Sequence, residues 1–176
     1  MTFFNILTME ATATLYSLKY NDIRTYIAAA AFIIGNIALP QLCHLIPQGG
    51  LIFLPIYFFT LVGAYKYGMT VGLLTAVLSP VVNSLIFGMP ATAVLPAILL
   101  KSTLLAIIAA MVARRIGKAS ILGLTGVVLG YQILGTMGEW ALCGSLVTAL
   151  QDFRIAIPGL LIQIFGGYFV INRLRN

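Results

Sequence analysis

The sequence predicts an all-α integral membrane protein, a bundle of six transmembrane helices with both termini in the cytoplasm. Composition is the first observation behind this prediction, because 61% of the residues are apolar and only 8% are charged, proportions that a soluble domain does not have. The apolar residues also form long continuous runs, whereas the strands of a membrane β-barrel would alternate with a period of two. Finally, the basic residues fall in small groups between these runs, as topology signals do.

The chain of 176 residues leaves no room for a soluble domain beside such a bundle. Residues 1–25 are predicted to form a short cytoplasmic or interfacial segment, because their start lacks the basic residues of a secretory signal and contains Glu10. Residues 26–176 then form a single membrane domain, with room for about six helices of 18 to 20 residues and short connections.

The first three spans are expected over residues 26–44, 51–65 and 69–87. The first ends before Pro47, where a helix cannot comfortably continue. The second would cover only about 22 Å at 1.5 Å per residue, less than a hydrocarbon core of about 30 Å, so we expect it to be short, tilted or partly re-entrant. The third follows a turn at residues 66–68 and returns the chain to the side that it left.

The last three spans complete the bundle. The fourth begins near Ala91 or at Pro96, a residue that suits the first position of a helix, and it ends at the basic residues 114–118. The fifth is expected over residues 120–144, and the sixth runs from about residue 155 or 158 to 171. With six spans, both ends of the chain lie on one side of the membrane.

The basic residues orient this bundle. One group lies on the side of the termini: Lys19, Arg24, Lys66, Arg114, Arg115, Lys118, Arg173 and Arg175. Only Arg154 lies opposite, and Lys101 falls within the fourth span. Because cytoplasmic loops are rich in Lys and Arg, the side of the termini is predicted to be cytoplasmic, in a multi-pass protein of the inner or plasma membrane. Membrane lipid is the expected surrounding, and such dispersed charges do not predict nucleic acid as a partner.

Two charges, Lys101 and Glu139, fall inside the apolar runs. A charge near the middle of a bilayer costs on the order of 3 kcal/mol, so each one requires a local reason. If the fourth span begins at Pro96, Lys101 lies about 7.5 Å from its outer end and can snorkel to the interface. A start at Ala91 would place it about 15 Å deep, beyond the reach of its side chain.

Depth places four polar side chains at one level. Counted from the outer ends of their helices, the following residues lie about 6 to 8 Å below the outer face: Lys101, Glu139, Gln163 and Asn83. On the fifth span, polar and small residues recur every three or four positions and form one stripe: Gln132, Gly135, Thr136, Glu139 and Cys143. Such a stripe is expected to face protein or a cavity instead of lipid.

Three interpretations of this layer are open. In the first, Lys101 and Glu139 form a dry ion pair that sets the register of their helices. In the second, the four polar groups line an outward-facing pocket for a polar solute. Trp140, Met89 and Tyr57 would then be apolar or stacking walls, although the default role of Trp140 is an interfacial anchor. In the third, the spans are rotated so that the groups never meet.

The first span carries a separate signal. Ala31 and Gly35 have the small-xxx-small spacing that lets helices approach closely, and residues 28–31 place small side chains around much of the helix. Similar pairs in the other spans are expected to pack the bundle itself. The face of Ala31 and Gly35 is therefore a candidate contact for a partner helix.

Catalysis has no visible residues in this sequence. It contains no phosphate-binding glycine loop, no serine hydrolase elbow and no pair of metal-binding histidines on a helix. Cys43, His44 and Cys143 all fall near the outer face, but without a supporting spacing motif the cysteines are better explained as free or disulfide-bonded surface residues. We therefore expect no enzyme activity, no cofactor and no bound metal.

Several short motifs resemble those of the substrate-binding S components of energy-coupling factor (ECF) vitamin transporters. The resemblance covers most of the chain as six short helices, and it is sharpest between residues 53 and 90. These features carry it: Phe53-Leu54-Pro55, Gly63, Lys66-Tyr67-Gly68, Gly72-Leu73-Leu74, Leu78-Ser79-Pro80 and Gly88-Met89-Pro90. They are similar to the family's pattern from helix 2 to the loop after helix 3.

The resemblance implies a subunit that captures a water-soluble vitamin or related micronutrient from the outer face and releases it inside. A transmembrane coupling protein and two cytoplasmic ATPase subunits would supply the energy, in agreement with the missing nucleotide motif. Small residues on the first helix would contact the coupling protein, a pattern that Ala31 and Gly35 match loosely. The outer ends of helices 4 to 6, with Lys101, Glu139 and Gln163, would hold the ligand.

Two other classes of function are open. One is a six-helix membrane scaffold of the cell-shape type, which binds no ligand, and the other is an intramembrane enzyme. A dry and fully paired polar layer would favour the scaffold, whereas a nucleophile with its base or a metal set would favour the enzyme. The polar layer near the outer face therefore discriminates among the three classes.

Overall fold

The computed structural model of the protein describes residues 15–174, and all regular secondary structure in this part of the chain is helical. The first 14 residues of the predicted N-terminal segment lie outside it. The rest of that segment lies against residues 66 and 67, at the end of a later helix. Tyr16 N–H donates to the Lys66 carbonyl at 2.8 Å, and Leu18 N–H donates to the Tyr67 carbonyl at 3.1 Å. The segment therefore packs on the bundle before the first long helix begins.

Five helices among the described residues are long and apolar enough to cross a membrane. They are α2 (Ile23–Cys43), the unit of α3 (Gly49–Phe53) and α4 (Pro55–Tyr67), α5 (Met69–Phe87), α6 (Leu95–Ile116) and α7 (Ile121–Cys143). They coincide with the first five predicted spans. The chain thus has the architecture of an all-helical, multi-pass membrane protein.

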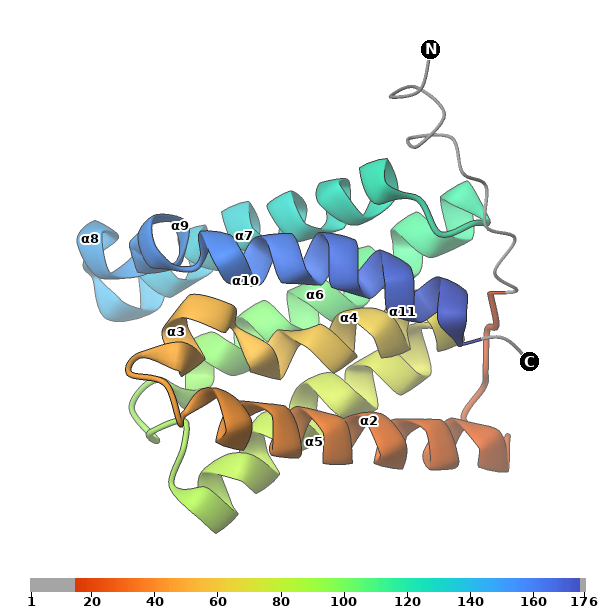
Figure 1. Cartoon of the computed structure of the whole chain (residues 1–176), viewed down its shortest axis with the longest axis horizontal. Coiled ribbons are helices and arrows are strands. Elements are labelled where there is room, and N and C mark those ends of the chain that lie inside the picture. Colours follow the sequence, from red (N-terminus) through yellow and green to blue (C-terminus); the bar gives the residue numbers. More distant parts are fainter. Residues whose placement is uncertain (1–14, 175–176) are drawn as a thin grey trace.

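Shorter pieces follow α7. They are α8 (Leu146–Ala149), α9 (Gln151–Ile155), α10 (Ile157–Leu161), the π-helical segment η1 (Ile162–Gly166) and α11 (Gly167–Arg173). The last three join into one helical run of roughly 25 Å, on the residues where the sixth span is predicted. This run packs against both α4 and α7 (Figure 1).

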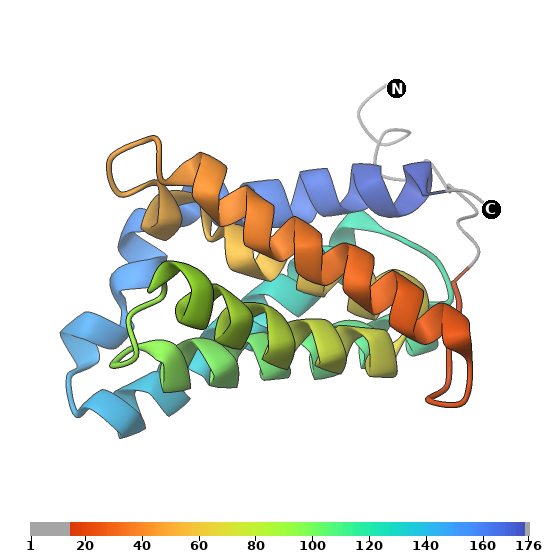
Figure 2. The same cartoon turned by 90° about the horizontal axis from the view of Figure 1, so that it is seen from below.

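The helices gather the basic residues at one end of the bundle (Figures 1 and 2). At this end α2 begins, α11 ends, and short turns join α4 to α5 and α6 to α7. We call it the basic end, and its described basic residues are Lys19, Arg24, Lys66, Arg114, Arg115, Lys118 and Arg173. Arg175 lies outside the described residues. The opposite end, called the short-helix end, carries α3, α8, α9 and the loop of residues 88–94.

The second predicted span is broken into two pieces. Leu54 has a left-handed backbone with φ of 46°, and α4 begins at the next residue, Pro55. Proline suits this first position because the N–H that it lacks would have no partner in the helix. Most of α4 is buried, and it packs against α2, α5 and α6. The short second span is therefore a central helix of about 20 Å with a separate cap.

A fully bonded amide joins three of these helices. Asn36 of α2 donates from Nδ2 to Thr60 Oγ1 of α4 at 2.9 Å and to Ser79 Oγ of α5 at 3.1 Å. Its Oδ1 accepts from Phe59 N–H at 3.1 Å. Because hydrocarbon offers no hydrogen bonds, a buried amide in a membrane bundle must find its partners within the protein. Asn36 does so and fixes α2 against α4 and α5.

The run from α10 to α11 approaches the break between α3 and α4 very closely. A Cβ added at Gly159 would lie 2.6 Å from both the carbonyl carbon and the carbonyl oxygen of Phe53. Rotation of a side chain cannot relieve contacts with backbone atoms. A residue without Cβ is therefore needed at this crossing.

Gly159→Ala is expected to destabilise the protein by about 1–3 kcal/mol, because the new methyl group must push α10 away from Phe53. Gly126→Ala is the matched control, since Gly126 also lies within a helix but an added Cβ would meet nothing within 4 Å. This control should keep or slightly raise the stability. Thermal unfolding of the two purified variants in detergent measures the difference, and equal melting temperatures would contradict the close approach.

Candidate functional site

A charged pair lies inside the bundle between α6 and α7. Lys101 Nζ forms an ion pair with Glu139 Oε2, and the two side chains are only 3% and 19% exposed. The aliphatic part of Lys101 crosses α7 at Gly135, where an added Cβ would lie 2.6 Å from Lys101 Cγ. Lys101 therefore points into the protein toward α7 and does not snorkel to the interface.

Further polar side chains are buried on the two helices that carry this pair and on η1. Ser102 follows the lysine on α6, whereas Gln132 and Thr136 lie about two turns and one turn before the glutamate on the same face of α7. Gln163 comes from η1, the π-helical segment, and π-helical turns in proteins are frequent at functional sites. We call this set the polar cluster: Lys101, Ser102, Gln132, Thr136, Glu139 and Gln163.

The polar cluster has unused hydrogen-bonding capacity. Within the cluster, these buried atoms have no hydrogen-bond partner: Ser102 Oγ, Gln132 Nε2, Gln132 Oε1, Thr136 Oγ1 and Gln163 Nε2. Elsewhere among the described residues, both side-chain polar atoms of Asn172 on α11 are unbonded too. The oxygen of Gln163 is bonded, because it accepts from the Tyr131 hydroxyl at 3.0 Å. Buried polar groups almost always bond to protein, ordered water or a ligand. A concentration of unused donors and acceptors is typical of a site that receives a polar molecule.

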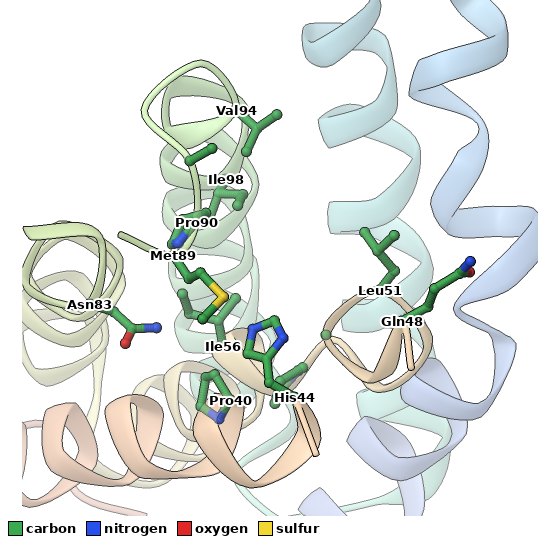
Figure 3. Close-up of a pocket in the computed structure, with 13 residues that line it drawn as sticks. Pro40, His44, Gln48, Leu51, Ile56, Asn83, Met89, Pro90, Val94 and Ile98 are labelled. Atoms are coloured by element: carbon green, nitrogen blue, oxygen red, sulfur yellow. The ribbon is translucent and has the colours of Figure 1, made fainter. Parts of the chain in front are cut away.

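A cavity of about 350 Å³ opens at the short-helix end, bounded by α2 to α6 and the loop of residues 88–94 (Figure 3). Most of its wall is apolar, from Pro40, Leu51, Pro55, Ile56, Met89, Pro90, Ala91, Val94 and Ile98. The His44 ring lies beside Met89, and Asn83 points toward the same space, whereas the Gln48 carboxamide points away (Figure 3). Asn83 is held in place because its Oδ1 accepts from Gln41 Nε2 at 3.1 Å.

The cavity and the polar cluster have one helix in common, α6, and the residues that line the cavity include no member of the cluster. Ile98 lines the cavity, and Lys101 and Ser102 follow three and four residues later on the same side of α6, roughly 4 to 6 Å deeper. About one turn of α7 beyond Gly135, Tyr131 packs against Tyr57 of α4, with 5.7 Å between ring centroids. On α6 the polar cluster thus begins about one helical turn beyond Ile98 of the cavity wall.

The residues of the predicted polar layer are divided between the polar cluster and the cavity. Lys101, Glu139 and Gln163 belong to the polar cluster, whereas Asn83 and Met89 line the cavity. The interpretation in which the spans are rotated and the groups never meet is wrong for Lys101 and Glu139, because they form an ion pair. Depth alone predicted one level for all four polar residues, whereas Asn83 of α5 lines the cavity and does not belong to the polar cluster.

The remaining predicted residues lie elsewhere. Tyr57 is buried beside Tyr131, next to the cavity wall, and Trp140 is 49% exposed near the end of α7, the position of an interfacial anchor. On α2, Ala31 is exposed. Gly35 faces inward, since an added Cβ would lie 2.8 Å from the Phe59 ring.

Sequence reasoning missed part of the site. Gln132 and Thr136 were visible as members of the polar stripe, but nothing in the stripe identified them as unpartnered. Ser102 has only its position next to Lys101 as a signal. His44 follows the end of α2, and its place in the cavity depends on how the following loop turns back over α4.

Comparison with other proteins adds no assignment, because no family model, curated protein or solved structure matches the chain. The polar cluster and the cavity are therefore the features from which a function is inferred.

Replacing the two buried amides by leucine should have opposite effects. Asn36→Leu removes three hydrogen bonds and leaves the Phe59 N–H without its acceptor, so we expect a loss of about 1–3 kcal/mol. Gln132→Leu removes two unbonded polar atoms from an apolar setting and should keep the stability or raise it by up to about 2 kcal/mol. Thermal unfolding of ligand-free protein measures both changes.

A fall in melting temperature for Gln132→Leu as large as that for Asn36→Leu would contradict the assignment of Gln132 to a site with unused capacity. It would show instead that both amides have structural roles.

Proposed function

We propose that this protein is the solute-binding subunit of an ECF-type importer. It captures a water-soluble vitamin or related micronutrient at the outer face of the cell membrane and delivers it to the cytoplasm. The observation that carries this proposal is the polar cluster, whose unbonded hydroxyl and amide groups are buried in an otherwise apolar bundle that also has a cavity at its short-helix end. The resemblance of residues 53–90 to S components supports the same proposal.

The proposed topology has six spans, the sixth being the run from Ile157 to Arg173. The basic end faces the cytoplasm, because Lys and Arg are enriched in cytoplasmic loops, and both termini are on that side. The short-helix end then faces outward and presents the cavity to external solutes. Each part of the site is accordingly placed for capture from outside.

Delivery requires partners in this proposal. The sequence has no phosphate-binding loop, so two cytoplasmic ATPase subunits supply the energy and a transmembrane coupling protein transmits it. The coupling protein would contact α2, which exposes Ala31 together with much of its outer face, whereas Gly35 lets α2 pack closely on α4.

A membrane scaffold without ligand is the second candidate, and the ion pair between Lys101 and Glu139 favours it, because such a pair can set helix register. The neighbouring unbonded groups weigh against it. A dry scaffold gains nothing from buried hydroxyls and amides without partners, since each one costs free energy in an apolar interior.

Binding is tested with the double variant Lys101→Ala, Glu139→Gln. Mass spectrometry of molecules released from the purified wild-type protein should identify a small solute, and calorimetry should give a submicromolar Kd. The double variant should bind at least about tenfold more weakly, because both the local charges and the shape of the site change. Arg173→Ala at the basic end is the control and should bind like wild type.

Two results would contradict the proposal. Wild-type binding by the double variant would remove the polar cluster from the site. Wild-type protein that releases no small molecule and binds none would favour the scaffold.

Topology is tested with one native thiol at the short-helix end and one introduced thiol at the basic end. Cys143 is exposed at the short-helix end, so a membrane-impermeant maleimide added to intact cells should label it. In a Cys43→Ser, Cys143→Ser background, Arg115→Cys at the basic end should react only after the membrane is permeabilised. Labelling of Arg115→Cys in intact cells would reverse the proposed orientation.

A further inference from the structure

The chemistry of the polar cluster also limits the kind of solute. We infer that the solute has no net charge and presents a hydrogen-bond donor and an acceptor side by side on a compact ring, as a cyclic amide, a ureide or a pyrimidinone does. This inference rests on the proposed binding function, but it goes further by assigning the chemical class of the ligand.

The charges of the cluster are already matched. Lys101 and Glu139 neutralise each other within the bundle, and Lys101 is almost completely buried. A ligand carboxylate would have to draw Lys101 away and leave Glu139 without its cation, and a ligand ammonium would do the reverse. An uncompensated charge in a low-dielectric interior is strongly unfavourable. The intact pair therefore selects against solutes with a net charge.

The unused atoms are those of neutral groups. The Gln132 carboxamide has both its donor Nε2 and its acceptor Oε1 unbonded, and Gln163 contributes a second donor Nε2 while Tyr131 holds its oxygen. A carboxamide that offers a donor and an acceptor in one plane is complementary to another amide-like edge. Ser102 and Thr136 add hydroxyl groups that can donate or accept.

The cavity at the short-helix end, which shares α6 with the cluster, fits the rest of such a molecule. Its volume of about 350 Å³ is at the lower end of the range for small-molecule sites, which favours a compact ligand. Side chains of Pro55, Ile56, Pro90 and Ile98 give it apolar walls, and these suit the faces of a ring. The polar edge of that ring would then face the polar cluster.

The experiment compares three probes that share a benzene ring and differ in charge, together with two neutral heterocycles. Benzamide has the amide edge, benzoate carries a carboxylate and benzylammonium carries an ammonium group, while uracil and 2-imidazolidinone present the edge within the ring. Full-length protein in lipid nanodiscs is titrated with each probe, and the shift in melting temperature is recorded. Benzamide, uracil and 2-imidazolidinone should stabilise at concentrations at least tenfold lower than the charged probes.

Two matched variants locate the effect. Gln132→Leu should abolish the shift with the amide probes, because it removes the paired donor and acceptor. Gln151→Leu, the same replacement outside the cluster and the cavity, should leave that shift unchanged. Mass spectrometry of the molecule that co-purifies with the wild-type protein should identify a neutral compound with an amide-like edge.

The outcomes distinguish an error in the inferred ligand class from a failure of the binding function itself. If benzoate or benzylammonium stabilises more strongly, or if the co-purifying molecule carries a net charge, the inferred ligand class is wrong while the solute-binding function stands. An equal response of Gln132→Leu and wild type also overturns the inference. If no probe binds and no molecule co-purifies, the binding function itself fails.

Discussion

Hydrocarbon cannot supply hydrogen bonds, and this constraint governs every polar side chain inside the bundle. Asn36 meets it completely, with two donated bonds and one accepted bond that join α2, α4 and α5. The polar cluster between α6, α7 and η1 meets it only in part, because the Lys101 and Glu139 charges pair while the surrounding hydroxyl and amide atoms do not. The protein thus has one polar centre, Asn36, whose hydrogen bonds are complete, and a second, the polar cluster, whose donors and acceptors are partly unbonded.

Departures from regular helix occur beside the second centre. The α3–α4 unit breaks at Leu54, and η1 places a π-helical turn at Gln163. Irregular backbone at membrane depth is tolerated where protein surrounds it or where it borders a cavity. Gly159 ties the two departures together by packing directly on the Phe53 carbonyl. Both the wall of the cavity and the position of Gln163 therefore depend on how the run from α10 to α11 crosses this break.

Hydropathy and chain length predicted most of the fold, and the third span has the bounds of α5 (Met69–Phe87). Depth counting also placed Lys101 and Glu139 at one level, and the structure joins them in an ion pair. It failed to separate Asn83 from these two, since depth says nothing about the angle around the bundle axis. The break at Leu54 could not be predicted, because a non-glycine residue with positive φ is held by tertiary packing and not by local preference.

A buried ion pair is a poor source of stability, because apolar residues of similar volume at the same positions are often as stabilising or more so. Unbonded amides and hydroxyls are costlier still in an apolar interior. The polar cluster therefore lowers the stability of the bundle relative to an apolar packing of α6 on α7, and Asn36 and the close glycine contacts have to offset that loss. A group of unbonded donors and acceptors at one site is what selective binding of a polar solute requires, because a solute that completes these hydrogen bonds removes the cost of burying the groups unbonded.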